Sequence, residues 1–318
     1  MRKVLAIVLA VLALGGCDHS KSIGSLREIG FALPENRSIV EDIEDLRKQE
    51  LKLYGTYTFD GVTARLFDGE RLYYDAQLPG WDYADTRYWI ADAAYRFCSV
   101  SPYGVPCTFS DDEGKVTISG YSGSTGGADI LYAAAERDLK DNEDYSTVPL
   151  HFHHACTGVQ FNLVNASSQV LKDVRNIRLV GLQNKGDFSF DSKGAVAWVL
   201  DGSTIGAENY EQPYGGVCTL PEGGLPVNLT VKYPLYDERV LMIIPQTIYK
   251  TAVTLHLEYI KEGDAEYAVR NIELGWLGGT TPTEWKAGEK YEYNLTITDN
   301  TITAEVFVVD WVDDYVDL

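Results

Sequence analysis

Residues 253–259 read VTLHLEY, and every second side chain in this run is apolar. The positions between them carry Thr254, His256 and Glu258, which are polar. An alternation with a period of two is typical of a β-strand that buries one face and leaves the other in water. Sheets built from such strands bury their apolar faces against each other. This stretch therefore predicts a β-sandwich.

The same β character extends along the chain from residue 51 onward. The sequence holds 21 tyrosines and 29 glycines, which suits short strands joined by tight turns. The stretch DILYAAAERD at residues 129–138 fits either a strand or a helix. Asp299 and Asn300 suit a tight hairpin turn, because asparagine tolerates a positive φ angle. This turn would join strands at residues 291–298 and 302–312.

The length of the chain, 318 residues, allows two domains that each have a core of their own. Residues 139–147 are polar and poor in apolar side chains, which makes them a suitable seam between domains. We therefore predict an all-β protein with two tandem β-sandwich domains. The first would span residues 38–146 and the second residues 147–318.

The N-terminus has the features of a lipoprotein signal peptide, which we place at residues 1–16. Arg2 and Lys3 precede an apolar run, and two glycines then precede Cys17. The apolar run is shorter than the ~20 residues that a membrane-spanning helix needs, so it indicates a removable secretion signal. We expect cleavage between Gly16 and Cys17 and attachment of acyl chains such as palmitate to Cys17, which would anchor the protein in the outer membrane before it reaches the cell surface. The alternative is an ordinary secretion signal with an incidental cysteine.

A leader at residues 17–37 follows the signal, and it contains one short apolar strand. Ile29, Phe31 and Leu33 alternate as one face of this strand. The leader ends in a proline and then in Arg37. Nothing in its composition alone explains why a strand should stand in an otherwise polar segment.

The net charge limits the binding partners that we expect, and the number of cysteines bears on disulfide formation. The formal net charge is −20, and it becomes −22 once Arg2 and Lys3 leave with the signal. Such a surface repels phosphate backbones, so we expect no nucleic acid partner. Four further cysteines, an even number in a secreted protein, allow either disulfides or free thiols. These are Cys98, Cys107, Cys156 and Cys218.

No motif of catalysis stands out, and we predict neither an enzyme nor a bound cofactor or metal. His151 and His153 would point the same way in a strand and could seat a metal, but a third ligand at matching spacing is missing. His154 would share the opposite face with apolar neighbours, which indicates the edge of a core. Trp81 and Trp89 could stack on sugars, although aromatic residues of β proteins more often lie in the core.

Four groups of stretches together resemble the fimbrillin-like lipoproteins of Bacteroidales, the subunits of type V pili. The stretches are GWDY at residues 80–83 with YW at 88–89 and YRF at 95–97, DILYA at 129–133 with LHFHH at 150–154, LMIIPQ at 241–246, and WKAGEKYEY at 285–293 with VVDW at 308–311. Each is weak alone, but their order covers nearly the whole mature chain. The resemblance implies transthyretin-like sandwich domains in a structural subunit or tip adhesin of a fimbria.

The resemblance also implies a processing step that would explain the leader. The leader strand would fill a groove in the first domain until an arginine-specific protease cuts between Arg37 and Ser38, with Arg47 as the fallback site. The groove would then accept a strand from another fimbrial subunit, in a homo- or heteropolymer. An unpaired sheet edge over an apolar trough is a template for such strand addition.

The strand that enters a neighbour's groove is expected to come from the C-terminal end of the chain. Its candidate inward residues are Ile302, Ala304, Val306, Val308 and Trp311. In the alternative, this segment is simply the last strand of the second domain. Whether the chain is a stalk, tip or anchor subunit stays open, as does its host or bacterial surface ligand. The competing hypothesis is a monomeric surface lipoprotein that binds glycans through exposed aromatic residues.

Overall fold

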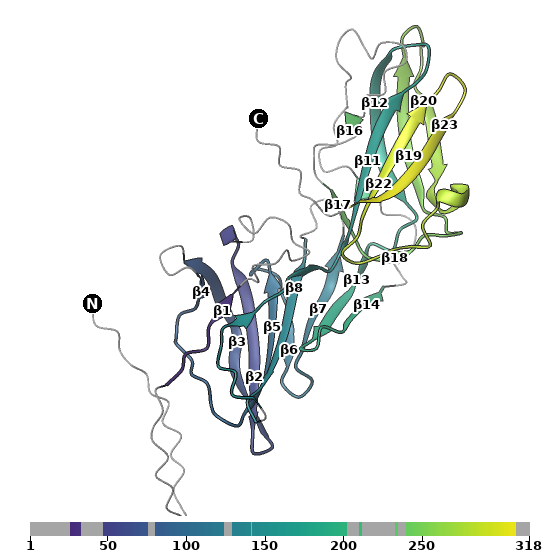
Figure 1. Cartoon of the computed structure of the whole chain (residues 1–318). Coiled ribbons are helices and arrows are strands. Elements are labelled where there is room, and N and C mark those ends of the chain that lie inside the picture. Colours follow the sequence, from purple (N-terminus) through teal and green to yellow (C-terminus); the bar gives the residue numbers. More distant parts are fainter. Residues whose placement is uncertain are drawn as a thin grey trace, which may run out of the picture.

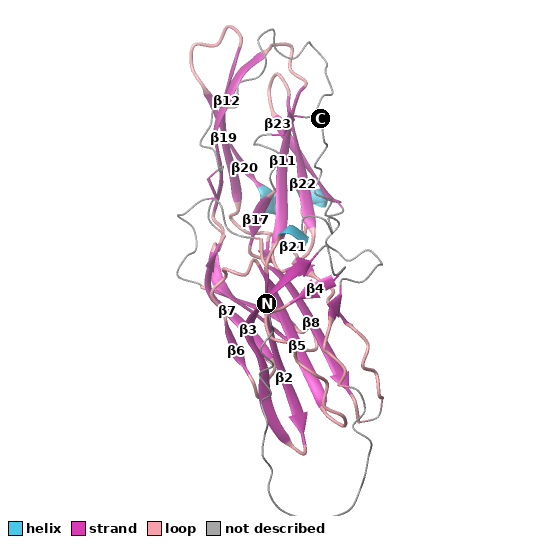
Figure 2. Cartoon of the chain, turned by 90° about the vertical axis from the view of Figure 1, so that its left-hand side faces the viewer, coloured by secondary structure: helices cyan, strands magenta, loops and turns pink. Residues whose placement is uncertain are grey.

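The computed structural model describes residues 26–32, 47–75, 80–123, 129–140, 142–201, 210–211, 233–234 and 240–309. Apart from residues 47–48 and two short 3₁₀ turns, every regular element in these ranges is a β-strand. The strands form two sandwiches that stand end to end in an elongated molecule (Figures 1 and 2). The predicted all-β class and sandwich architecture are confirmed. No described helix has the length and apolar character needed to cross a membrane.

The first sandwich is built on a large sheet with the strand order β10-β8-β5-β2-β3-β4-β1-β9. Its strands are β1 (Phe31–Ala32), β2 (Leu51–Phe59), β3 (Val62–Asp75), β4 (Gly80–Asp82), β5 (Ala94–Ser101), β8 (Leu131–Asp138), β9 (Val148–Pro149) and β10 (His153–His154). The two ends of this order, β9 and β10, are separated only by residues 150–152. The sheet therefore curls until its two ends come together at this segment. The ambiguous stretch at residues 129–138 is the strand β8, paired with β5.

A second sheet covers the outer face of this curl, with the order β14-β13-β7-β6. Its strands are β6 (Thr108–Ser110), β7 (Lys115–Ser122), β13 (Lys185–Asp191) and β14 (Val196–Leu200). Because β13 pairs with β7, residues 185–200 belong to the first sandwich. A division at residue 146 is therefore wrong for these sheets. The physical reason is that β13 and β14 complete a sheet whose other two strands, β6 and β7, end more than sixty residues before β13, a pairing that no local pattern reveals.

The first sandwich has two cores because its central strands are buried on both faces. On β2, Leu53 points into the curl of the large sheet, whereas the next residue, Tyr54, points toward the second sheet. On β5, Phe97 likewise points into the curl, and Cys98 points toward the second sheet. Successive side chains of a strand point to opposite faces, so a strand between two cores is apolar at consecutive positions. We call the core inside the curl the inner core.

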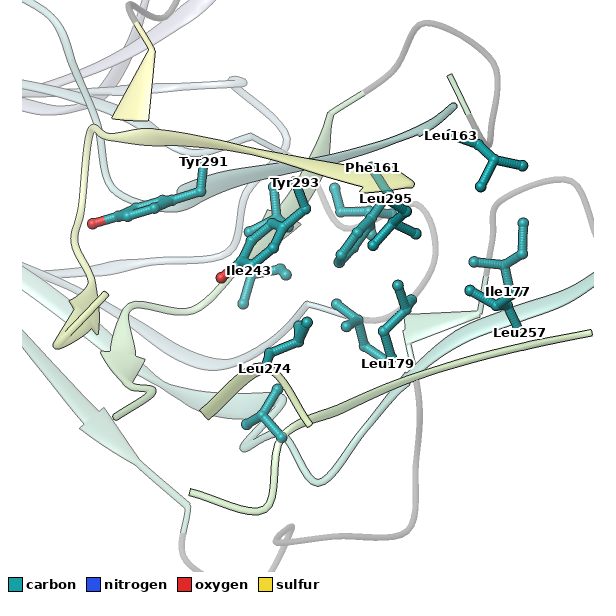
Figure 3. Packing of buried hydrophobic residues seen from close by; sticks show 14 of the residues in the cluster. Phe161, Leu163, Ile177, Leu179, Ile243, Leu257, Leu274, Tyr291, Tyr293 and Leu295 are labelled. Carbon is teal, nitrogen blue, oxygen red and sulfur yellow. The ribbon is translucent and has the colours of Figure 1, made fainter. Parts of the chain in front are cut away.

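The second sandwich packs two further sheets face to face around one large core, part of which Figure 3 shows. Its strands are β11 (Thr157–Asn165), β12 (Leu171–Val180), β15 (Tyr210–Glu211), β16 (Tyr233–Pro234), β17 (Leu241–Ile243), β19 (Thr254–Lys261), β20 (Ala268–Glu273), β22 (Lys290–Ile297) and β23 (Ile302–Val309). One sheet has the order β16-β11-β22-β23, with β17 also on β11, and the other has the order β15-β12-β19-β20. The turns η2 (Leu274–Trp276) and η3 (Gly278–Thr280) follow β20.

The alternation at residues 253–259 corresponds to a strand that buries one face, as predicted. Val253, Leu255, Leu257 and Tyr259 are all buried in the core of the second sandwich. The polar residues between them are only partly exposed, because β19 lies in the middle of its sheet. The predicted hairpin is also present, since Thr298 N donates to Thr301 O at 2.8 Å between β22 and β23.

The two sandwiches are joined by a segment that contributes to the cores of both. Ile243 at the end of β17 is buried in the second sandwich, whereas Ile244 is buried in the first sandwich, in the core between its two sheets. Beyond it, β18 (Gln246–Thr247) pairs with β21 (Glu284–Trp285). The Gln246 side chain also holds both backbone groups of Gln183, which precedes β13, at 3.1 Å. The junction is therefore packed and hydrogen-bonded.

Candidate functional site

The leader strand β1 lies inside the large sheet, between β4 and β9. Figure 1 shows it next to β4. It runs antiparallel to β4, with Phe31 opposite Trp81, and parallel to β9, with Phe31 beside Val148. Without it, β4 and β9 would face each other across the width of one missing strand. We call the space that β1 occupies between β4 and β9 the slot.

Backbone hydrogen bonds hold the leader along residues 27–32. Ile29 N donates to Arg87 O at 2.9 Å, and Trp89 N donates to Arg27 O at 2.9 Å. On the other side, Val148 N donates to Gly30 O and Leu150 N to Ala32 O, both at 2.8 Å. These bonds involve main-chain groups only, so they would hold any strand of the same direction and register.

Two leader side chains fill the inner core. Ile29 and Phe31 each expose only 2% of their surface. The Phe31 ring meets three other rings edge to face, at centroid distances of 5.7 Å to Phe67, 6.1 Å to Tyr83 and 5.3 Å to Phe97. Burial of side chains of this kind contributes roughly 1.5–3 kcal/mol each. The leader is thus a structural part of the first sandwich.

Tyr83 binds the leader from within the core. Its hydroxyl donates to Ile29 O at 2.6 Å and accepts a hydrogen bond from Arg87 N at 3.2 Å. Burial raises the pKa of Tyr83 to about 12, although the hydrogen bond from Arg87 N opposes this shift. The hydroxyl therefore stays protonated at neutral pH and remains a donor to the leader.

The structure describes Ile29 and Phe31 of the predicted leader strand and, of the predicted processing residues, the fallback Arg47. Gly16, Cys17, Leu33, Arg37, Ser38 and Trp311 lie outside the described residues. The fallback residue Arg47 is half-buried, and its guanidinium carbon lies 4.7 Å from the centroid of the Tyr74 ring. Arg27 is exposed, but a cut there would leave Ile29 and Phe31 covalently attached to the rest of the chain.

The candidate donor segment lies at the other end of the molecule as the edge strand β23. Ile302, Ala304 and Val306 pack partly against the core of the second sandwich. Val308 breaks this alternation, because it exposes 61% of its surface, and Phe307 beside it exposes 49%. Here β23 pairs with β22 alone, so its other edge carries no described strand.

A comparison with known protein families shows to which family the chain belongs. A family model described as fimbrillin-like matches residues 47–311, most of the chain. The chain belongs to the fimbrillin-like family. This membership links it to fimbriae and adhesion at the cell surface, in a family of structural and adhesion proteins that are generally not enzymes. The match begins after the leader, so the leader is not part of it.

Solved structures share the fold of this fimbrillin-like chain. A fimbrial protein of Bacteroides vulgatus is 17% identical with a TM-score of 0.60, and the alignment covers 90% of this chain and 100% of that one. A candidate cell adhesion protein of Bacteroides uniformis is 15% identical with a TM-score of 0.55, and the alignment covers 90% of this chain and 99% of that one. No curated protein sequence matches the chain significantly.

The tryptophans named for glycan binding are not on the surface of the fimbrillin-like chain. Trp81 exposes 6% and Trp89 7% of its surface, and both belong to the inner core. The hypothesis of glycan binding through these two residues is therefore wrong, because the same rings that could stack on a sugar stack on protein. Among the described residues, the exposed aromatic side chains are those of Phe59, Tyr73, Tyr103, Tyr249, Trp276 and Phe307.

The histidines and cysteines have structural roles. His154 is buried and its Nδ1 lies 2.8 Å from Asp129 Oδ2, which agrees with the predicted core-edge position. Burial lowers the pKa of His153, and the neighbouring His151 and His154 lower it further. Cys98, Cys107 and Cys156 are free thiols, and burial raises the pKa of Cys98 and Cys156. No three metal-binding side chains cluster in the described ranges.

Sequence reasoning missed the residues that form the walls of the slot. From the sequence, Tyr83 is only part of the GWDY stretch and Val148 only part of the predicted second domain. In the structure Val148 flanks the leader, and Tyr83 binds the leader backbone. The sequence did contain one signal for these residues, the apolar strand in a polar leader. Such a strand must pack against neighbouring strands that are equally apolar. Which strands supply them depends on how the sheet curls, and no local pattern contains that information.

Proposed function

We propose that this chain is a fimbrial subunit that joins its neighbours by strand exchange at the slot. The observation that carries the proposal is the position of the leader between β4 and β9, with Ile29 and Phe31 in the inner core. A segment that precedes the family match thus completes a sheet of the conserved fold. Such a segment can be replaced by any strand with the same direction and apolar face.

The proposed sequence of events starts at the membrane. The signal at residues 1–16 is removed, and lipid on Cys17 anchors the precursor in the outer membrane. An arginine-specific protease then cuts between Arg37 and Ser38, or after Arg47. Either cut separates the leader from β2 but leaves it bound by its hydrogen bonds and two buried side chains. A strand from another subunit must therefore displace the leader.

The incoming strand is proposed to be the C-terminal segment that contains β23. Support comes from its edge position and from its apolar side chains, two of which, Phe307 and Val308, are exposed. A strand with one free edge costs less to detach than a central strand, because it gives up one ladder of hydrogen bonds and not two.

The test treats the purified precursor with an arginine-specific protease and follows its N-terminus by mass spectrometry and its size by light scattering. We expect a new N-terminus at Ser38 followed by oligomers. The Arg37→Gln variant should stay monomeric unless Arg47 is used, which Arg37→Gln/Arg47→Gln would show. A precursor that is cut at Arg37, loses its leader and still remains monomeric would contradict strand exchange.

A further inference from the structure

The leader contains two arginines, one on each side of its apolar strand. Arg37 follows the strand, and Arg27 stands two residues before Ile29. Cuts at the two positions have opposite results. A cut after Arg37 separates the strand from the rest of the chain, whereas a cut after Arg27 removes the proposed anchor at Cys17 and leaves the strand attached. An arginine-specific protease therefore has two bonds to distinguish within one short segment.

The backbone around Arg27 is held in the sheet, although its side chain is exposed. Trp89 N donates a hydrogen bond to Arg27 O at 2.9 Å. The next residue, Glu28, forms a β-bridge with Tyr88, and Ile29 after it exposes only 2% of its surface. The peptide bond between Arg27 and Glu28 thus lies at the start of the paired segment, and the residues that follow it fill the slot.

The guanidinium of Arg27 is also engaged. Its carbon lies 4.5 Å from the centroid of the Tyr145 ring, and this ring packs against the inner core. The face of an aromatic ring attracts a cation, so the arginine side chain is held over the ring. A protease that cuts after arginine must withdraw this side chain and bind residues on both sides of the bond. Because a folded segment is cut through its opened state, the leader must first leave the slot.

We propose that the bond between Arg27 and Glu28 is a second cleavage site, closed while the leader fills the slot and open once another strand displaces it. Water adds across this bond and leaves a carboxylate on Arg27 and an amine on Glu28. The order is then fixed, with Arg37 cut first, strand exchange next and Arg27 cut last. The protease and the displacing strand are taken from the proposed function, whereas the closed state of the bond is a property of the precursor alone.

Cleavage at Arg27 keeps a displaced leader from returning to the slot. It divides the leader into residues 17–27, which keep the anchor, and residues 28–37, which carry the apolar strand away from the membrane. The second piece has also lost Arg27 O, the acceptor for Trp89 N, so it would rebind with one hydrogen bond fewer. An uncut leader would stay beside the subunits on the membrane and compete with the incoming strand.

The first experiment digests the purified precursor with an arginine-specific protease and follows the fragments by mass spectrometry. A free peptide of residues 22–34 gives the rate at which the unpaired sequence is cut after Arg27. We expect the same cut in the precursor to be at least about a hundredfold slower, since it waits for local opening of the sheet. A delay of less than about tenfold would overturn the closed site and leave strand exchange untouched.

Tyr83→Phe tests whether the slot controls this cut, because it loosens the leader without changing the sequence that the protease binds. The variant loses the hydrogen bond to Ile29 O, so we expect the cut after Arg27 to become about fivefold faster. Tyr73→Phe is the matched control and should leave the rate unchanged, because the Tyr73 hydroxyl bonds to Asp82 at 3.4 Å. An unchanged rate in Tyr83→Phe would overturn control of the bond by the slot.

An assembly reaction with the protease present tests the open state. The peptide of residues 28–37 should appear in step with the oligomers. Oligomers whose displaced leaders stay uncut at Arg27 would overturn the second site. A chain that is cut at Arg37 and never assembles would overturn strand exchange and leave the closed site standing.

Arg27→Lys tests the consequence of the second cut. Lysine keeps a cation near Tyr145 but offers no arginine to the protease. We expect this variant to be cut at Arg37, to release no peptide of residues 28–37 and to reach a smaller fraction of oligomers than the wild type. Equal fractions would overturn the role of the second cut in keeping the leader from returning.

Discussion

Phe31 is the side chain that contributes most to holding the leader in place. It exposes 2% of its surface and meets the rings of Phe67, Tyr83 and Phe97 edge to face. Such ring pairs add to the gain from burial because the positive edge of one ring meets the negative face of another. A residue that lies sixteen positions before the start of the family match at residue 47 thus belongs to the inner core.

Truncation of this ring tests that conclusion. We expect Phe31→Ala to lower the free energy of unfolding of the first sandwich by about 3–5 kcal/mol, since a cavity replaces a fully packed ring. Chemical denaturation followed by tryptophan fluorescence would measure it. Leu26→Ala is the control, because Leu26 exposes 69% of its surface and should change little. Equal effects of the two substitutions would mean that the leader does not fill the core.

The contribution of Tyr83 to the stability of the same site depends on pH. Its pKa is about 12 in the folded chain, mainly because of burial, and about 10 in an unfolded one. The unfolded state therefore releases the proton first, and stability is complete below pH 10 and falls as the pH rises toward 12.

Tyr83→Phe should reveal this dependence. At pH 8 we expect the variant to be less stable by about 1 kcal/mol, because the bond to Ile29 O is lost. Between pH 10 and 12 the wild type loses about 1.4 kcal/mol for each pH unit through this group, whereas the variant does not. Urea unfolding at a series of pH values should show the difference shrink and then change sign. A constant difference would show that Tyr83 ionises normally.

The strands β4 and β9 depend on the leader because each pairs with it inside the large sheet. The amides of Val148 and Leu150 donate to leader carbonyls at 2.8 Å, so they are protected from water while the leader is present. An edge created by removal of the leader would expose these donors over an apolar trough. This is the physical basis of strand addition at the slot.

Hydrogen exchange can observe this edge directly. After cleavage at Arg37 and removal of the leader, we expect the amides of Val148 and Leu150 to exchange at least about tenfold faster. Amides of β22 should keep their protection, since they pair with β11 and β23 in the other sandwich. Unchanged protection of Val148 would show that β9 does not rely on the leader.

The molecule as a whole is two sandwiches whose cores meet at one segment. Ile243 and Ile244 follow each other in the chain but are buried in different sandwiches. Gln246 adds hydrogen bonds to Gln183, where the chain returns from the second sandwich to the first. A junction that shares core residues and hydrogen bonds should couple the unfolding of the two parts.

Calorimetry of two isoleucine variants tests the coupling. Ile244→Ala should cost about 2–5 kcal/mol and split the unfolding into two transitions, because it removes the link to the first sandwich. Ile248→Ala removes an equally buried side chain from the second sandwich alone and should lower stability without splitting the transition. A single transition in both variants would show that other contacts hold the junction.

The strands with one buried face were predictable from sequence alone, whereas strands between two cores were only partly so. The alternation in residues 253–259 identifies β19 because a period of two has one physical cause. The stretch at residues 129–138 contains three consecutive alanines and suits two structures. Its pairing with β5 on one side and β10 on the other decides in favour of the strand.

The sequence by itself determined the β class, the hairpin at residue 299 and the apolar face of the leader, because each depends on neighbours in the chain. Only the tertiary structure decided that residues 185–200 complete the first sandwich, that Trp81 and Trp89 are buried, and that Val148 and Tyr83 hold the leader. These features depend on strands that are distant in the chain and meet only when the large sheet curls. The geometry of that curl is a property of all its strands together, so no local pattern records it.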